Sequence, residues 1–182
     1  MMKRVLIANR GEIALRIIRT CRRLGIETVA VYSDADAGTP HVEAAVAGVR
    51  IGPPPASASY LDAAAILAAA RHAGADAVHP GYGFLSENAA FARASVEAGL
   101  IFVGPPAAVI DRMGSKTASR DAVRAAGVPV VPGETPASQD PKAIRDAIES
   151  VGYPALLKAV SGGGGKGMRV VRSTAEVAEA IS

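Results

Sequence analysis

The sequence of 182 residues is poor in the residues that build disulfide frameworks, metal centres and stacking platforms. It contains one cysteine, Cys21, which excludes an internal disulfide and any zinc site made of several cysteines. Tryptophan is absent, and four tyrosines and three phenylalanines offer few platforms on which nucleic-acid bases stack. The three histidines, at positions 41, 72 and 79, lack the spacing of metal ligands. Neither a disulfide-rich protein nor a zinc protein is expected.

Charge of one sign and long apolar runs are also scarce. Lysine and arginine total 20 and aspartate and glutamate total 17, so the formal net charge is +3, too small to favour a nucleic-acid partner. No apolar run approaches the ~20 residues of a membrane span. The apolar stretch after Lys3 and Arg4 is about four residues long, below the ~7–15 of a signal peptide. We therefore expect a soluble, cytoplasmic α/β protein without a nucleic-acid or membrane partner.

Strands and helices alternate over roughly the first 105 residues. Residues 5–8 form an apolar run, residues 11–24 carry apolar side chains at helical spacing up to Gly25, and residues 28–32 are β-branched and apolar. A β-α-β unit of this length favours a parallel sheet with a right-handed crossover. The alternation continues with strands at residues 46–51, 76–79 and 100–103 and helices at residues 62–73 and about 86–98. The pattern predicts an α/β, doubly wound parallel sheet.

The pattern changes after about residue 113. We expect helices at residues 115–126 and from Asp140-Pro141 onward, then two strands joined by a glycine loop, at residues 155–160 and 168–171. Residues 173–176 match a capping box that opens a last helix. No stop signal precedes Ser182, so the second domain is expected to be truncated. The expected organisation is one domain over residues 1–113 and the beginning of another over residues 114–182.

The strongest chemical feature is the run Gly162-Gly163-Gly164-Gly165-Lys166-Gly167. Consecutive glycines let the backbone approach a ligand and direct several N–H groups at it. The run is not a Walker A loop, because Val160 and Gly167 occupy positions that this motif reserves for glycine and for serine or threonine. A flap over phosphates and a flexible hairpin turn without a ligand both fit. Lys158, in the apolar strand just before it, either meets an anion or faces solvent.

Three further segments are candidates for ligand contact. Lys116 stands in the first turn of a predicted helix, where a bound anion would favour it, although a solvated lysine fits equally. Residues 9–12 and 79–88 each follow a strand, at the sheet edge where open α/β folds bind ligands. Tyr82, between two glycines, is placed to lie against a small ring. The alternatives are a structural turn at residues 9–12 and a rigid loop that packs Tyr82 and Phe84 into the domain.

Seven segments resemble the amino-terminal part of biotin carboxylase, in the family's order and over essentially the whole chain. This enzyme is a subunit or domain of acetyl-CoA, propionyl-CoA, methylcrotonyl-CoA and pyruvate carboxylases. The wider ATP-grasp group, including carbamoyl-phosphate synthetase, agrees less well. The segments are residues 7–14 (IANRGEIA), 59–61 (SYL), 79–88 (HPGYGFLSEN), 102–105 (FVGP), 113–116 (MGSK), 126–129 (AGVP) and 163–171 (GGGKGMRVV).

The resemblance implies a pre-ATP-grasp domain followed by the start of an ATP-grasp fold whose lid holds the glycine run. It implies that ATP and Mg²⁺ activate bicarbonate as carboxyphosphate and that biotin, held on a carrier protein, accepts the carbon dioxide. Phosphoryl transfer of this kind needs positive charge and donors around the phosphates. The implied contacts are Lys116, Lys158, Gly164, Gly165 and Met168 with ATP, and Tyr82 and Gly83 near biotin.

The family's magnesium-binding glutamates, catalytic base and bicarbonate-binding residues lie downstream of this chain. We therefore expect no catalytic residue and no metal ligand here, and no turnover by the 182 residues alone. A carrier protein, a carboxyltransferase and a homodimer contact through Arg16 and Arg19 are implied as partners. Two alternatives stay open: a non-catalytic assembly fragment, which the intact Lys116 and Lys158 disfavour, and another ATP-grasp ligase, which the Tyr82 loop disfavours.

Overall fold

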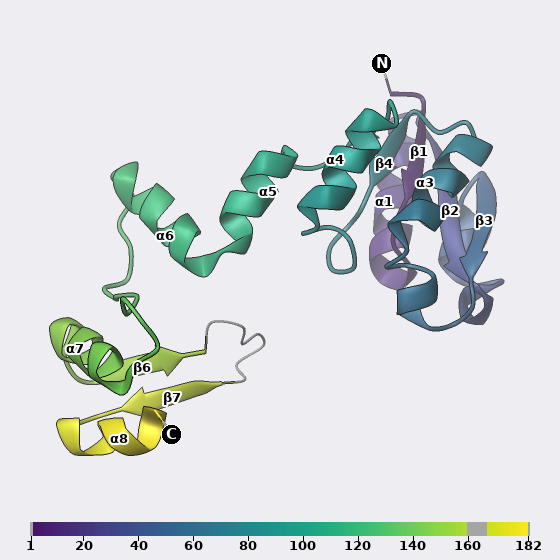
Figure 1. Ribbon diagram of the computed structural model, residues 1–182. Helices are drawn as coiled ribbons and strands as arrows, with labels where there is room; N and C mark the ends of the chain where they lie inside the picture. Colours follow the sequence, from purple (N-terminus) through teal and green to yellow (C-terminus); the bar gives the residue numbers. More distant parts are fainter. Residues whose placement is uncertain (1, 160–166, 182) are drawn as a thin grey trace. The chain divides into compact units, whose positions relative to one another are not determined.

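The computed structural model describes residues 2–159 and 167–181. The chain forms two compact units, residues 1–116 and 117–182, and each is described here by itself (Figure 1). In the described ranges, no helix combines the length and the apolar character needed to cross a bilayer.

A five-stranded parallel sheet forms the centre of the first unit, with the strand order β3-β2-β1-β4-β5. Val5 of β1 lies opposite Thr28 of β2 on one side and Ala77 of β4 on the other. The chain first winds outward from β1 to β3 and then restarts beside β1 with β4, so the topological switch point lies between β1 and β4. The strands are β1 Arg4–Ile7, β2 Glu27–Ser33, β3 Ala47–Gly52, β4 Ala77–His79 and β5 Ile101–Phe102.

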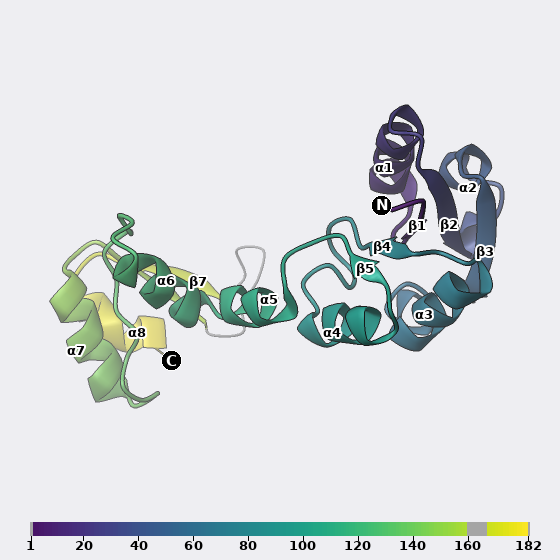
Figure 2. The same cartoon turned by 90° about the horizontal axis from the view of Figure 1, so that it is seen from above.

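Helices cover both faces of this sheet, which confirms the doubly wound fold. Figure 2 shows α1 (Gly11–Arg23) and α2 (Pro40–Ala44) on one side and α3 (Ala63–His72) and α4 (Ala89–Glu97) on the other. Successive side chains of a strand point to opposite faces, and both faces must be apolar when both are covered. The cluster on the α1 side holds Val5, Ile7, Ala14, Ile17, Ile18, Cys21 and Ala77. The cluster on the other side includes Leu6, Ala8, Val29, Val31, Ile66, Val78 and Phe91.

Side-chain caps fix where two of these helices begin. The Asp62 carboxylate accepts a hydrogen bond from the Ala65 N–H at 3.0 Å, and the Asn88 side chain accepts one from the Phe91 N–H at 2.9 Å. The helix start predicted at Ser86 or Asn88 is therefore at Asn88. Helix α5 (Ala107–Gly114) was not predicted, and its buried Ile110 packs against α4.

Asp76 holds β1 and β4 together at their amino-terminal ends. Its two carboxylate oxygens accept hydrogen bonds from the backbone N–H of Lys3 at 2.8 Å and of Arg4 at 3.0 Å. Its own N–H donates to the Arg4 carbonyl at 3.0 Å. Partial burial alone would raise the pKa of Asp76, but the backbone donors outweigh it and leave that pKa below its ordinary value. The amino-terminal ends of β1 and β4 are thus fixed to each other.

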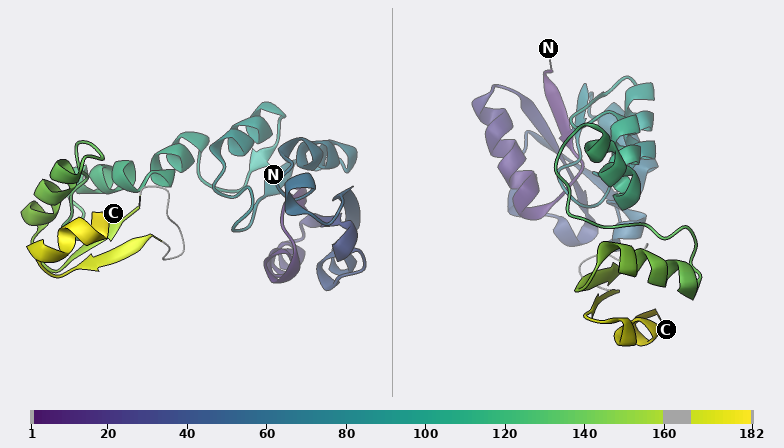
Figure 3. Two further views of the ribbon diagram at one scale, coloured as in Figure 1. Left: turned by 60° about the horizontal axis from the view of Figure 1, so that its bottom comes forward. Right: turned by 90° about the vertical axis from the view of Figure 1, so that its left-hand side faces the viewer.

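The second unit packs helices on an antiparallel hairpin. Figure 3 shows α7 (Pro141–Val151) and α8 (Val177–Ile181) beside the strands β6 (Ala155–Lys158) and β7 (Met168–Val171). Helix α6 (Lys116–Ala125) begins at the boundary between the units. The core of the second unit is small, and its buried members are Ile148, Ala155, Val171 and Val177.

The capping box predicted before the last helix is not formed. The Ser173 side chain caps nothing, and residues 174–176 form a 3₁₀ turn from which α8 continues. Glu176 accepts a hydrogen bond from the Arg172 N–H at 2.9 Å, one residue earlier than the box requires. The tighter 3₁₀ turn moves the backbone N–H groups away from the positions that an α-helical first turn gives them.

Candidate functional site

A pocket of about 300 Å³ lies at the switch point of the sheet, where the chain leaves β1 and β4. One lip is the turn from β1 into α1 and the other is the loop after β4. The two predicted segments at the carboxyl edge of the sheet therefore meet at one site, as expected for an open α/β fold. The lining residues are Asn9, Arg10, Glu12, Ile13, Tyr82, Gly83 and Phe84.

Asn9 ties the two lips together. Its amide nitrogen donates hydrogen bonds to the carbonyls of Pro80 and Tyr82, both at 2.8 Å, and its side chain is buried. Gly81 lets the amide come this close, because a Cβ added there would lie 2.8 Å from the Asn9 nitrogen. Gly81 also has a φ of +66°, which L side chains rarely adopt. Asn9 is therefore a structural clamp of the pocket.

His79 also holds the loop after β4, through a hydrogen bond from the loop's backbone. The Gly81 N–H donates to Nδ1 of His79 at 3.0 Å, so this nitrogen acts as an acceptor and the neutral ring carries its proton on Nε2. Burial lowers the pKa of His79, which favours that neutral form.

Tyr82 and Gly83 are on the pocket's lip, where the resemblance placed biotin. The Tyr82 ring is 62% exposed, and its hydroxyl donates to the Glu12 carboxylate at 3.2 Å. This hydrogen bond and the charge of Glu12 raise the pKa of Tyr82. Phe84 instead packs inward, with its ring stacked on Tyr60 at a centroid distance of 5.1 Å. The two aromatic side chains of the loop thus have different roles.

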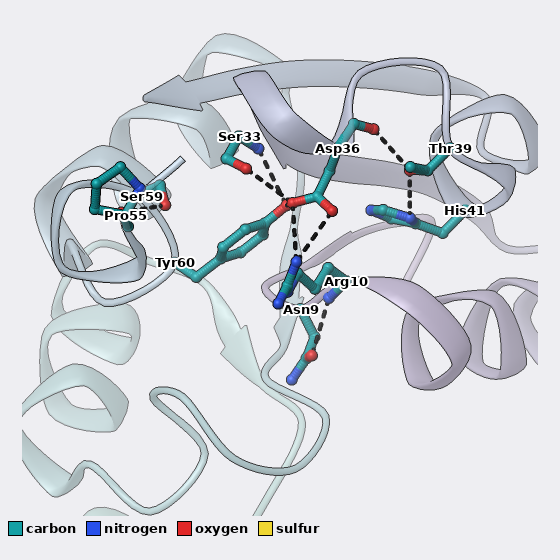
Figure 4. Close-up of polar contacts among 9 residues, drawn as sticks. All are labelled: Asn9, Arg10, Ser33, Asp36, Thr39, His41, Pro55, Ser59 and Tyr60. Atoms are coloured by element: carbon teal, nitrogen blue, oxygen red, sulfur yellow. Dashed lines mark hydrogen bonds and ion pairs between the residues drawn. The ribbon is translucent and has the colours of Figure 1, made fainter. Parts of the chain in front are cut away.

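A polar cluster centred on the buried Asp36 adjoins the pocket through Arg10 (Figure 4). Asp36 accepts hydrogen bonds from the Tyr60 hydroxyl at 2.7 Å, the Ser33 hydroxyl at 2.8 Å and Nη1 of Arg10 at 3.2 Å. Burial alone would raise the pKa of Asp36, but these donors outweigh it and leave that pKa below its ordinary value. Burial, together with the bond to Asp36, raises the pKa of Tyr60 to about 12. Sequence reasoning missed this cluster, although Tyr60 belongs to the SYL motif.

His41 borders the cluster and is buried as well. The Thr39 hydroxyl donates to the Asp36 carbonyl at 2.7 Å and lies 2.9 Å from Nδ1 of His41 (Figure 4). A hydroxyl has one proton to give, so Nδ1 of His41 is the donor in the second contact. Burial lowers the pKa of His41, and the ring is neutral at pH 7.

The second candidate surface is the outward face of the β6–β7 hairpin. Lys158 lies directly opposite Met168, and Leu156 lies directly opposite Val170. Directly opposite residues on paired strands share a face of the sheet. All four side chains are exposed, with Leu156, Met168 and Val170 each 46–49% exposed. The hairpin therefore presents an apolar strip with a lysine at the end that leads into the glycine run.

The other predicted ATP contacts are only partly described. Lys116 is the first residue of α6, so its predicted place in the first turn of a helix is confirmed. Gly164 and Gly165 lie outside the described residues. Within the described ranges, no three His, Cys, Asp or Glu side chains gather in a way that would hold a metal ion. The described residues thus do not fit a magnesium site, and we derive no step through that ion.

Two family models together match nearly the whole chain. The model described as biotin carboxylase, N-terminal domain, matches residues 1–110. The model described as carbamoyl-phosphate synthase L chain, ATP binding domain, matches residues 115–182.

Curated relatives match along the full sequence. A biotin carboxylase of Halalkalibacterium halodurans is 55% identical over 182 residues, which are 100% of this chain and 40% of the relative. The mitochondrial methylcrotonoyl-CoA carboxylase subunit alpha of Oryza sativa is 54% identical over 180 residues, 99% of this chain and 24% of the relative. The chain thus spans well under half the length of these proteins.

Solved structures agree. The biotin carboxylase of Campylobacter jejuni, in a β-γ-ATP complex, matches with a TM-score of 0.91 at 43% identity, over 99% of this chain and 40% of that one. The biotin carboxylase domain dimer of Hydrogenobacter thermophilus 2-oxoglutarate carboxylase, with MgADP, ADP and bicarbonate, matches with a TM-score of 0.89 at 46% identity, over 98% and 39%. A family model that covers more than half of the chain and relatives that span all of it show that this chain belongs to the biotin carboxylase family.

Proposed function

We propose that this chain is the amino-terminal part of a biotin carboxylase that uses ATP, Mg²⁺ and bicarbonate to carboxylate biotin on a carrier protein. This is the first half-reaction of an acyl-CoA carboxylase, of the kind that serves fatty acid biosynthesis. The observation that carries the proposal is the pairing of Lys158 with Met168 on one exposed hairpin face. The two residues are ten positions apart in the sequence, and the resemblance implies that both contact the nucleotide.

The hairpin face suits a nucleotide on physical grounds. An apolar strip of Leu156, Met168 and Val170 offers a flat surface for a base, and Lys158 supplies a positive charge at the end of the strip. Lys116, Gly164 and Gly165 complete the proposed ATP contacts, by resemblance. The Campylobacter jejuni relative was solved with a nucleotide bound, which supports the same role here.

The pocket at the switch point suits the ring of biotin. Its exposed Tyr82 and its glycine-flanked loop leave room beside an aromatic surface, and the exposed Arg10 and Glu12 bring charged groups to the rim. We assign Tyr82 and Gly83 to the vicinity of biotin on this ground and on the resemblance.

The domain organisation follows the same reasoning. We assign residues 1–113 to the pre-ATP-grasp domain and residues 114–182 to the beginning of the ATP-grasp domain. The two family-model matches and the two compact units support this division. The resemblance implies that the metal ligands and the catalytic base lie downstream of this chain, so we expect the 182 residues to be inactive alone.

The proposed partners are a biotin carrier protein or domain, a carboxyltransferase and a second copy of the enzyme, with the cytoplasm as the site of action. Arg16 and Arg19 are exposed on α1, as a helix that contributes to a homodimer contact requires. The Hydrogenobacter thermophilus relative was solved as a dimer, which supports the homodimer.

A chimera tests the proposal. Residues 1–182 are joined to the remaining length of the Halalkalibacterium halodurans enzyme, and ADP release that depends on both biotin and bicarbonate is measured. We expect activity in the chimera and none in the 182-residue chain. Lys158→Ala should raise the KM for ATP about tenfold or more, since a hydrogen bond to a charged group contributes ~1.5–3 kcal/mol.

Lys142→Ala is the matched control, because Lys142 is an exposed lysine of the same unit that pairs with Asp146 four residues on. Its KM for ATP should stay unchanged. Equal effects of the two substitutions would show that the hairpin face does not bind the nucleotide. A folded chimera that hydrolyses ATP without any dependence on biotin would indicate another ATP-grasp ligase.

A further inference from the structure

We propose that Asp36 is a positioning residue of the switch-point pocket, and that its carboxylate orients both lips through Arg10 and Tyr60. The assignment of the pocket to biotin rests on the proposed function, whereas the positioning itself rests on the contacts of the described residues. Asp36 belongs to neither lip. It follows β2, and it reaches the pocket only through its partners (Figure 4).

The carboxylate of Asp36 is fully engaged and nearly buried. Its side chain is 12% exposed, while in each of the other ion pairs of the described residues both side chains are at least 40% exposed. Exposed pairs contribute little to stability, and a buried charge is costly unless several donors surround it. Asp36 has three donors, from Tyr60, Ser33 and Arg10. An aspartate that accepts hydrogen bonds from three donors can hold these partner side chains in fixed orientations.

The first route leads from Asp36 to the lip after β1. Nη1 of Arg10 lies 3.2 Å from Oδ1 of Asp36, and the Arg10 guanidinium carbon lies 5.7 Å from the centroid of the Tyr60 ring. The ion pair with Asp36 and the cation–π contact with Tyr60 together fix the position of the guanidinium group. Arg10 also lines the pocket, and its side chain is 52% exposed.

The second route leads to the lip after β4. The Tyr60 hydroxyl donates to Asp36 and accepts from the Ser33 N–H at 3.0 Å, which fixes the ring at its polar end. The Phe84 ring stacks on Tyr60 with an interplanar angle of 15°. Phe84 has a φ of +42°, a conformation that persists in a non-glycine residue only where the surroundings impose it. The stacked ring of Tyr60 is part of these surroundings.

Both routes converge on one carboxylate, so neutralising it should disturb both lips at once. Arg10 would lose its charge partner, and Tyr60 would lose the acceptor of its hydroxyl proton. Tyr82, two residues before Phe84, would then drift from Glu12, to which it now donates at 3.2 Å. The sheet itself should remain, because Asp36 belongs to neither of the two apolar clusters that pack on it, and its bond to a cluster residue involves the hydroxyl of Tyr60 and not its ring.

The test compares Asp36→Asn with Asp34→Asn in the 182-residue chain. Asp34 is the matched control, since it also follows β2 and pairs with an arginine, Arg50, but both partners are about half exposed and neither lines the pocket. NMR of the phenol carbons follows the titration of Tyr82, and hydrogen exchange follows the amides of residues 80–84 and of β1. Both readouts work without any ligand.

We expect Asp36→Asn to lower the pKa of Tyr82 toward the ordinary value of about 10 and to speed exchange in residues 80–84 by tenfold or more, with β1 little changed. Asp34→Asn should do neither. An unchanged Tyr82 titration, or exchange that speeds equally in the loop and in β1, would overturn the proposal, because the second result marks a merely structural role. If Asp36→Asn does not fold, Tyr60→Phe replaces it, and the same two readouts apply to the loop.

The chimera with the remaining length of the Halalkalibacterium halodurans enzyme allows a kinetic measurement as well. Asp36→Asn should raise the KM for free biotin by about tenfold while the KM for ATP stays unchanged, and Asp34→Asn should change neither. Equal changes in both constants would contradict positioning at this pocket. A chimera without biotin-dependent activity would refute the proposed function alone, because the titration and exchange results would still decide whether Asp36 positions the pocket.

Discussion

Gly81→Ala should destabilise the first unit far more than Gly83→Ala, although both glycines belong to one loop and have nearly the same φ, +66° and +69°. An alanine in this left-handed region costs about 1–2 kcal/mol at either position. At Gly81 the new Cβ would also lie 2.8 Å from the Asn9 amide nitrogen, whereas at Gly83 it would meet no described atom within 4 Å. The difference between the two variants therefore reports the crowding of Asn9, with a smaller part from Ile13.

The magnitude follows from what the clamp loses. Asn9 donates two hydrogen bonds at 2.8 Å, and a buried hydrogen bond contributes about 0.5–1.5 kcal/mol net. Gly81→Ala should thus lower the free energy of unfolding by about 2–5 kcal/mol, which is about 1–3 kcal/mol more than Gly83→Ala. Hydrogen exchange of the buried β1 and β2 amides measures this quantity for the first unit by itself.

A double-mutant cycle completes the test. In an Asn9→Ala background the clamp is already absent, so Gly81→Ala should cost nearly the same as Gly83→Ala. Any residual difference reports the contact with Ile13, whose Cγ1 would lie 3.2 Å from the added Cβ. The reasoning is refuted if the two alanine variants differ by less than ~0.5 kcal/mol when Asn9 is present, the usual limit for non-coupled sites.

Three further predictions concern stability. Burial lowers the pKa of His41 and of His79, so the unfolded chain binds protons at a higher pH than the folded chain does. The free energy of unfolding should therefore decline below pH ~6.5, the ordinary pKa of histidine. Urea titrations of the His41→Asn variant should show a smaller decline, because the contribution of His41 is removed and that of His79 remains. Asn88→Ala removes the cap of α4 and should cost about 1 kcal/mol in the same urea assay. Ile66→Ala, at a core position that is 0% exposed, should cost about 2–5 kcal/mol by thermal unfolding, while Leu24→Ala, at a position that is 67% exposed, should stay within about 0.5 kcal/mol.

Sequence patterns predicted the elements whose signals are long and local. On the apolar stripe expected for α1, Ile17, Ile18 and Cys21 are buried, and Cys21 is a core residue as expected. Ile13 and Leu15 of the same stripe are only half-buried. Helices α2 and α5 escaped prediction for two different reasons. Five residues from Pro40 to Ala44 do not complete two helical turns, and α5 is set by the packing of Ile110 on α4.

The candidate site could be predicted only as far as strand order allows. Residues that follow parallel strands meet at one edge of the sheet, so the two segments that form the lips of the pocket could be predicted from the sequence. Asp36 was not, because it lies 26 residues from Arg10 and 24 from Tyr60 along the chain. These contacts depend on how the crossovers pack, and no local spacing encodes that.

The hydrogen bonds of Asp76 and Asn9 fasten the same two strands at opposite ends. The N–H groups of Lys3 and Arg4 donate to Asp76 where β1 and β4 begin, and the ladder then pairs residues 5–7 with residues 77–79. Beyond the ladder, Asn9 donates to two carbonyls of the loop after β4. The walls of the pocket therefore rise from a strand pair that is held at both ends.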